Sequence, residues 1–145
     1  MYATVTDMIA RFGEVQIVRL SNPEDRTAEA PDEVKVNTAL EDATALINSY
    51  IRGRYLVPIA SPPKDIVRAA CVIARHDLAD TERSSPSEEM TKGKAEVIKW
   101  LENIAKEIVH LDIPLAAVTG GNAVGSGPRI SDRERIVTFE TLRGF

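Results

Sequence analysis

The sequence predicts an all-α protein, a small helical bundle with short N-terminal helices and an extended C-terminal arm. Apolar residues recur at helical spacing in three long segments, and glycine, proline and capping residues separate these segments. The 145 residues suffice for one domain with a modest core. The composition, 43% apolar and 28% charged residues, is an ordinary globular balance.

The first two predicted helices are short. Thr4 and Asp7 are typical of a helix start, and Gly13 is typical of a helix end. Residues 14–20 predict a second short helix. The polar segment 21–31 contains two prolines and predicts a loop.

Residues 32–52 form the clearest predicted helix. Gly53 fits the glycine expected just past a helix end, where a left-handed conformation favours this residue. On that basis we expect Gly53→Ala to be destabilising. One face of the helix is apolar, with residues at steps of three and four: Val36, Leu40, Ala43, Ile47 and Tyr50.

The next predicted helix begins near Lys64 and runs to about Asp80. Its apolar surface is wide, which is typical of the central helix of a bundle. Cys71 lies in this surface and is expected to be a small buried hydrophobe. Asp77 lies on an apolar stripe, so we expect it to be partly buried and paired with a nearby arginine in a structural role.

A third long helix is predicted from Ser85 to about Ile108. Ser85 is the expected N-cap, Pro86 the first helical residue, and Glu88 the partner that completes a capping box. The expected buried face contains Met90, Val97, Leu101, Ile104 and Ile108, with Trp100 at its edge.

We therefore expect a helical bundle domain over residues 1–119, followed by a glycine-rich linker and extended arm over 120–145. In the linker GGNAVGSGP, four residues separate Gly120 from Gly125, as in a phosphate-binding loop, but Ser126 stands where that loop needs lysine. The arm contains spaced apolar residues with no core of their own: Ile136, Val137, Phe139, Leu142 and Phe145. An arm of this kind can dock on another subunit and become ordered there.

The sequence nominates no active site, no metal site and no cofactor site. His76 and His110 have no second histidine four residues away, and one cysteine excludes an internal disulfide and a multi-cysteine metal site. We therefore expect no enzymatic activity. No segment approaches the roughly 20 apolar residues of a membrane span, so a cytoplasmic setting is expected.

The segment SYIRGRYLVPIASPP admits two interpretations. Arg52 and Arg54 flank a glycine between two tyrosines, which could form a phosphate or nucleic-acid grip. The other interpretation is a helix end followed by an extended crossover. In that case Tyr50 packs on the helix face, and Tyr55, Leu56 and Ile59 hold the crossover to the bundle.

A DNA-binding regulator is the main functional alternative, because residues 6–20 resemble two helices around a tight turn. Against it, Ala10 and Gly13 are three residues apart rather than four. The second helix also begins with an acid and offers one arginine for phosphate contacts. The net charge of −4 does not favour DNA either. A small hydrolase is a more distant third possibility.

Four blocks carry a resemblance to a known family: MYATVTDMIARFGE, INSYIRGRYLVPI, IVRAACVIARHDL and KAEVIKWLENIAK. Together they resemble the Mu-type bacteriophage head–tail connector (head completion, or neck) proteins of phages and prophages. The likeness covers roughly residues 1–111 and the closing FETLRGF.

The resemblance implies a non-catalytic virion protein. It implies a homo-oligomeric ring of about a dozen subunits that docks on the portal, joins head to tail, and lets packaged DNA pass through. Portal and tail proteins are then the expected partners, without sequence-specific nucleic-acid binding. The candidate oligomer or partner contacts are Arg52, Arg54, Ile136, Phe139, Leu142 and Phe145.

Overall fold

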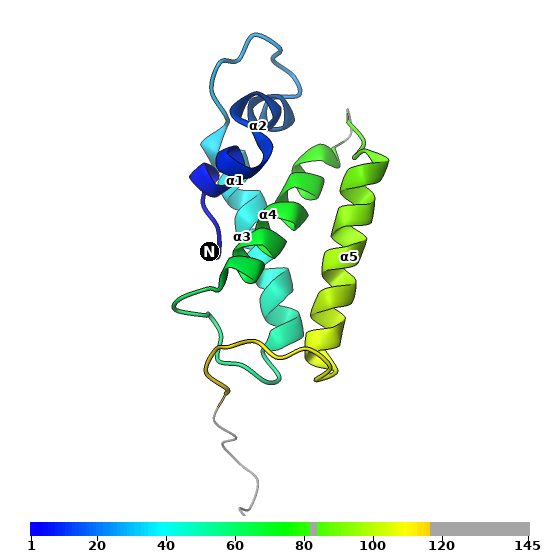
Figure 1. Ribbon diagram of the computed structural model, residues 1–145. Coiled ribbons are helices and arrows are strands. Elements are labelled where there is room, and N and C mark those ends of the chain that lie inside the picture. The colour runs from blue at the N-terminus through cyan, green and yellow to red at the C-terminus, as the bar shows by residue number, and fades with distance from the viewer. Residues whose placement is uncertain (82–83, 117–145) are drawn as a thin grey trace, which may run out of the picture.

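The computed structural model describes residues 1–81 and 84–116, which form five helices (Figure 1). The described residues contain no strand, only two isolated bridges, so the predicted all-α class is confirmed. The helices are α1 (Val5–Phe12), α2 (Glu14–Ser21), α3 (Glu33–Ile51), α4 (Lys64–Ala79) and α5 (Glu88–Ala105).

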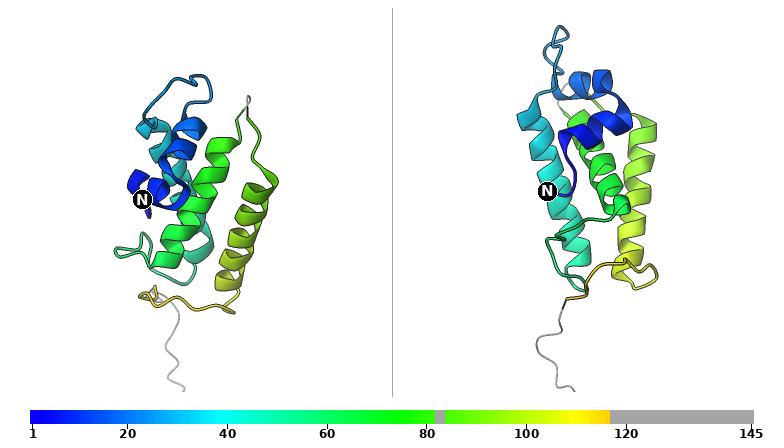
Figure 2. Two further views of the ribbon diagram at one scale, coloured as in Figure 1. Left: turned by 45° about the horizontal axis from the view of Figure 1, so that its top comes forward. Right: turned by 60° about the vertical axis from the view of Figure 1, so that its left-hand side comes forward.

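The three long helices α3, α4 and α5 pack against one another, and α1 and α2 lie across α3 and α4 (Figures 1 and 2). Helix α4 contacts all four other helices, which confirms the prediction of a central helix. Its sequence explains this position, because eight of its side chains are buried: Ile66, Ala69, Ala70, Cys71, Ile73, Ala74, Leu78 and Ala79.

The predicted apolar face of α3 is also confirmed. Val36, Leu40, Ala43 and Ile47 are fully buried, and Tyr50 lies partly buried against the core. Thr44 is buried as well, and its hydroxyl donates a hydrogen bond to the Leu40 carbonyl at 2.8 Å.

The start of α1 forms as the sequence predicts. The Thr4 hydroxyl accepts a hydrogen bond from the Asp7 amide at 3.2 Å, and the Asp7 carboxylate accepts one from the Thr4 amide at 2.8 Å. This reciprocal pair is a capping box. Gly13 alone separates α1 from α2, with φ 87° and ψ 144°, a conformation that favours glycine.

Tyr2 fastens the N-terminus to two distant segments. Its backbone amide donates to the Thr44 hydroxyl at 3.1 Å, and its phenolic oxygen accepts from the Ile59 amide at 3.1 Å. The phenol also donates to Asn48. Tyr2 is buried, so the chain ahead of α1 is part of the core.

The prediction for Gly53 is wrong, because its backbone is not left-handed. The end of α3 continues into a turn in which the Arg54 and Tyr55 amides both donate to the Ile51 carbonyl, at 3.0 and 2.9 Å. Arg52 at the C-cap keeps right-handed helical angles. A side chain at Gly53 would point into open space.

The predicted start of α5 is two residues too early. Ser87, not Ser85, is the N-cap, and its hydroxyl accepts from the Met90 amide at 3.3 Å. Pro86 therefore precedes the helix. This register places Glu88 and Glu89 in the first turn, where the helix dipole favours acids.

The predicted end of α5 is also wrong, because the helix stops at Ala105. Glu107 has a positive φ of 63° and reverses the chain. The Ile108 amide donates to the Asn103 carbonyl at 2.9 Å, and the Glu107 amide donates to Ile104 at 3.1 Å. These two bonds form a Schellman-type helix end. Ile108 consequently lies outside the helix and is 69% exposed, whereas Leu101 and Ile104 are buried as predicted.

Residues 106–116 form a strap beneath the bundle that returns to the end of α3 (Figure 2). Tyr55 anchors the strap, because its buried phenolic oxygen accepts from the Leu111 amide at 2.9 Å. The Ala116 amide donates to the Arg54 carbonyl at 2.8 Å, and Leu56 donates to Pro114 at 3.3 Å. The crossover interpretation of this segment is thus confirmed.

Candidate assembly surfaces

Arg52 and Arg54 lie at the end of the bundle from which residues 117–145 continue. Arg52 is exposed at the C-cap of α3. Arg54 turns toward the strap, and its Nη2 donates to Nδ1 of His110 at 2.6 Å, because a guanidinium can only donate. Its guanidinium also lies 5.4 Å from the centre of the Tyr55 ring. The structure therefore separates the two arginines and does not form a two-armed grip.

Arg54 leaves one donor unused at this end. Its Nη1 is buried and has no hydrogen-bond partner among the described residues. Buried donors are normally satisfied, so an acceptor from another segment or another molecule would fit here.

Apolar side chains are exposed at the same end. Leu56 was expected to help hold the crossover to the core, but it is 56% exposed, and Leu115 is 59% exposed. The buried residues Tyr55 and Ile59 hold the crossover instead. We call Arg52, Arg54, Leu56 and Leu115 the exit end of the bundle. The other predicted contacts, Ile136, Phe139, Leu142 and Phe145, lie outside the described residues.

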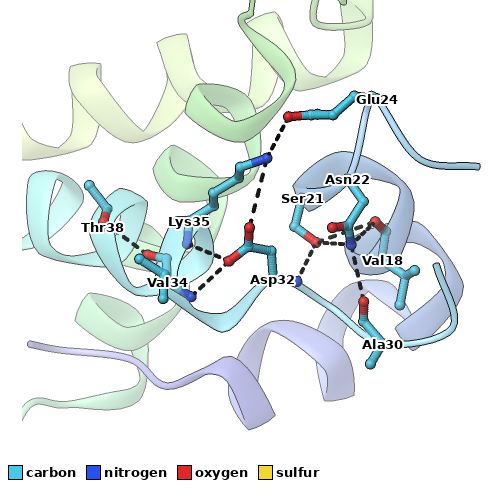
Figure 3. Close-up of polar contacts among 9 residues, drawn as sticks. All are labelled: Val18, Ser21, Asn22, Glu24, Ala30, Asp32, Val34, Lys35 and Thr38. Carbon is cyan, nitrogen blue, oxygen red and sulfur yellow. Dashed lines mark hydrogen bonds and ion pairs between the residues drawn. The ribbon is translucent and has the colours of Figure 1, made fainter.

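At the opposite end, the loop between α2 and α3 is fastened at both of its ends (Figure 3). The Asn22 amide group donates to the carbonyls of Val18 at 3.1 Å and Ala30 at 3.0 Å. The buried Ser21 hydroxyl accepts from the Asp32 amide at 3.0 Å. These contacts tie the two ends of the loop together, and sequence analysis missed them because each partner is distant or is a backbone group.

Charged side chains reinforce this loop (Figure 3). Lys35 Nζ lies 2.9 Å from a Glu24 carboxylate oxygen and 3.7 Å from an Asp32 oxygen. The hydrogen bond to Glu24 raises the pKa of Lys35 above its usual value. Within the loop, the Asp25 carboxylate accepts from the Thr27 hydroxyl and amide, which lowers its pKa. Lys35 thus stays protonated and already has acidic partners.

An open groove of about 730 Å³ lies between this loop, α3 and the end of α4. Its floor includes Val34, Thr38 and Asp42, which lie one helical turn apart on α3. Val34 is 76% exposed, the highest value among the exposed large apolar residues of the described chain. We call this the acidic groove, because Glu24, Asp42 and Asp77 line it against one lysine, Lys35. The four-residue spacing of Val34, Thr38 and Asp42, off the buried face of α3, is the sequence signal that could have found this groove.

Asp77 forms the structural ion pair that was expected, but its partner is a lysine rather than an arginine. Lys94 Nζ lies 2.6 Å from Asp77 Oδ1, which joins α4 to α5. His76 Nδ1 lies 3.3 Å from the same oxygen. Arg75, two residues before Asp77 on α4, instead stacks on Phe12, with its guanidinium carbon 4.3 Å from the ring centre.

Cys71 is buried in α4, as predicted. Burial raises the pKa of its thiol to about 11, although the nearby Arg11 side chain acts in the opposite direction. A thiol with this pKa is protonated at neutral pH, which is typical of a structural cysteine rather than a nucleophile.

The solvent-exposed face of α2 has few basic side chains that could contact DNA phosphates. Its exposed side chains are Glu14, Val15 and Arg19, and the groove beside it also contains Asp25, Glu29 and Arg26, so acids outnumber arginines by three to two there. Among the described residues there is no group of three or more histidine, cysteine or acidic side chains that could hold a metal ion. No helix of the described chain is long and apolar enough to cross a membrane.

Comparison with known proteins places this fold among phage proteins. Residues 2–125 match the family described as Bacteriophage Mu, Gp36. Gene product J of Escherichia phage Mu is 34% identical over 104 residues, which are 71% of this chain and 70% of that protein. The Mu-like prophage FluMu protein gp36 of Haemophilus influenzae is 35% identical over 86 residues, 59% of each chain. The resemblance to a Mu-type phage family is thus confirmed, and this chain belongs to the Bacteriophage Mu Gp36 family.

Proposed function

We propose that this chain is a non-catalytic structural subunit of a Mu-type phage particle, and that it joins head to tail as part of a connector ring on the portal. The family match over residues 2–125 carries this proposal, because it includes the whole described bundle. In this reading the protein belongs to the virion after assembly in the host cytoplasm.

The geometry supports an assembly role through its two unlike ends. The exit end exposes Leu56, Leu115 and Arg52, and the other end carries the acidic groove with Val34 exposed. When two different surfaces of one protein fit one another, neighbouring copies bind head to tail. Such a contact produces a closed ring if the rotation from each subunit to the next brings the last subunit back to the first.

Deletion of the gene from the phage or prophage tests this function. The expected result is DNA-filled heads and separate tails, counted by electron microscopy, with joined particles restored when the gene is supplied in trans. An epitope-tagged copy should appear at the junction of head and tail. Normal joined particles after deletion would remove the proposal, and so would absence of the protein from purified particles.

The DNA-binding regulator remains the alternative, and a short-duplex binding assay separates the two. A regulator predicts tight, salt-dependent binding by the free protein that is lost in an Arg11→Ala, Arg19→Ala variant. The acidic surroundings of α2 predict no such binding. Retained binding in that variant would move any DNA contact away from α1 and α2.

A further inference from the structure

We propose that the acidic groove receives the C-terminal segment 129–145 of a second copy of this chain. The inference rests on the proposed assembly function and names the contact that would join neighbouring subunits. The groove and the segment have complementary chemistry. The groove lies at one end of the described bundle, and the described chain stops at the other end, at Ala116.

The groove has the chemistry to bind a segment that is both apolar and basic. Leu20, Pro23, Ala39 and Leu78 contribute apolar surface around the exposed Val34. At about 730 Å³ it has space for several side chains. A pocket lined by apolar groups with a few fixed polar groups is typical of a binding site.

The charges of the groove favour a basic occupant. Asp42 is exposed and has no ion-pair partner among the described residues, and Lys35 is already held by Glu24 and Asp32. The fastened loop keeps its wall in place before anything binds, which lowers the entropy cost of binding.

The C-terminal segment carries the matching groups in sequence. Its first part, RISDRER, holds Arg129, Arg133 and Arg135 beside Asp132 and Glu134, so three positive and two negative charges leave a net charge of +1. Its last part, IVTFETLRGF, is rich in apolar and aromatic residues. Charge complementarity would orient the segment, and the apolar residues would supply most of its affinity.

The position of Ala116 favours a neighbouring copy over the same chain. The Ala116 amide is bonded to Arg54 beyond the C-terminal end of α3, whereas Val34 lies in the first turn of α3. The helix rises about 26 Å between Val34 and Ile51. To enter its own groove, the segment would have to return along this whole length, whereas a glycine-rich chain of 12 residues, the length of 117–128, has a typical end-to-end distance of about 20 Å. A neighbouring copy whose groove faces the exit end of this chain could receive the segment directly.

Mixing two full-length variants tests the inference. The groove variant Val34→Lys, Asp42→Lys changes two exposed residues and keeps its own C-terminal segment. The segment variant Arg133→Glu, Arg135→Glu keeps its own groove. In sedimentation velocity, the wild-type protein should self-associate, and each variant alone should associate at least tenfold more weakly.

The mixture should form a one-to-one heterodimer and nothing larger. One copy then supplies a working segment and the other a working groove, so only a single productive contact exists. The matched control Val15→Lys, Glu41→Lys makes the same charge change at exposed sites outside the groove and should associate like wild type.

Three outcomes of these measurements in solution would overturn the inference, and a fourth comes from phage particles. The first three are a wild-type protein that stays monomeric at its highest soluble concentration, a control that is as defective as the groove variant, and a mixture that does not associate. If the mixture does not associate and each variant alone is also less stable than the wild type, the segment lies in the groove of its own chain. Phage particles that contain this protein, but assemble normally with the groove variant, would remove this contact and leave the proposed function intact.

Discussion

Gly13 connects α1 and α2 by a single residue, and its conformation is one that other residues rarely adopt. With φ 87° and ψ 144° it serves as the C-cap of α1 and precedes the first residue of α2. Its amide donates to the Ile9 carbonyl at 2.8 Å, and its own carbonyl accepts from the Ile17 amide at 3.3 Å. The angle between the two helices therefore depends on this residue.

Gly13→Ala should destabilise the protein by about 1–3 kcal/mol, because a Cβ atom strains this backbone although no neighbouring atom lies within 4 Å. Gly53→Ala is the matched control. Gly53 is not left-handed and also has open space, so its substitution should be neutral or slightly stabilising. Urea unfolding of both variants measures the difference. Equal losses at the two positions would contradict the assigned backbone conformations.

The thiol of Cys71 makes stability depend on pH in the alkaline range. Its pKa of about 11 in the folded protein lies above the ordinary value of 9.0, because the buried site disfavours the thiolate. The native state therefore gains stability from this group below pH 9, and the gain is lost as pH rises toward 11, because the unfolded chain ionises first.

A Cys71→Ala variant should consequently lose less stability than wild type between pH 9 and 11. Other groups that titrate in this range are common to both proteins, so the difference between their unfolding curves isolates the thiol. Parallel curves would show that the thiol is not held in its neutral form. At pH 8, the native thiol should also react with Ellman's reagent only as fast as the protein opens.

The long helices show which elements could be predicted from sequence. The limits of α3 and α4 were predicted to within a residue or so, because each combines an apolar face of at least four turns with a clear boundary, Asp32 for α3 and the prolines before Lys64. Side-chain periodicity and local capping decide such elements, and both are visible in sequence.

The two ends of helix α5 were less predictable than those of α3 and α4, because local sequence does not decide them. Ser85 and Ser87 are both chemically able to cap, and in the folded chain a turn closed by the antiparallel bridge between Thr81 and Ser84 comes just before them. At the other end, Glu107 takes a positive φ that glycine normally supplies. Contacts that form only in the folded chain decide both ends.

Substitution of the two serines tests the register of α5. Ser87→Ala should cost about 1 kcal/mol, because the Met90 amide loses its acceptor. Ser85→Ala should change the free energy of unfolding very little, because Ser85 is exposed and precedes the helix. Thermal unfolding of both variants gives the comparison, and the reverse order would move the start of α5 back to Pro86.

At the scale of the whole molecule, the strap of residues 106–116 covers one end of the described bundle and is held there by hydrogen bonds. The strap ends at Ala116, whose amide is bonded to Arg54, and the Tyr55 phenol fixes its middle. Sequence analysis predicted an extended crossover near Tyr55 but not its pairing with residues 114–116, which are some 60 positions away and carry no pattern. The acidic groove was missed for the same reason, since three separate segments form it.

Truncation after Thr119 should leave the melting temperature nearly unchanged, because all of the described helices and the strap lie before this point. The same truncation should weaken self-association or attachment to the portal. Calorimetry and sedimentation on one preparation measure both properties. A large drop in melting temperature, with association per folded subunit intact, would assign residues 120–145 to the core of the monomer.

The attachment of Tyr2 has a consequence for synthesis on the ribosome. Its phenol binds the Ile59 amide, 57 residues later in the chain. At a translation rate of about 5–20 residues per second, roughly 3–11 s separate the emergence of the two residues. During that interval α1 and α2 are outside the ribosome without the helices that cover their apolar sides. A bulky fusion placed directly before Tyr2 should therefore interfere with folding at this late step.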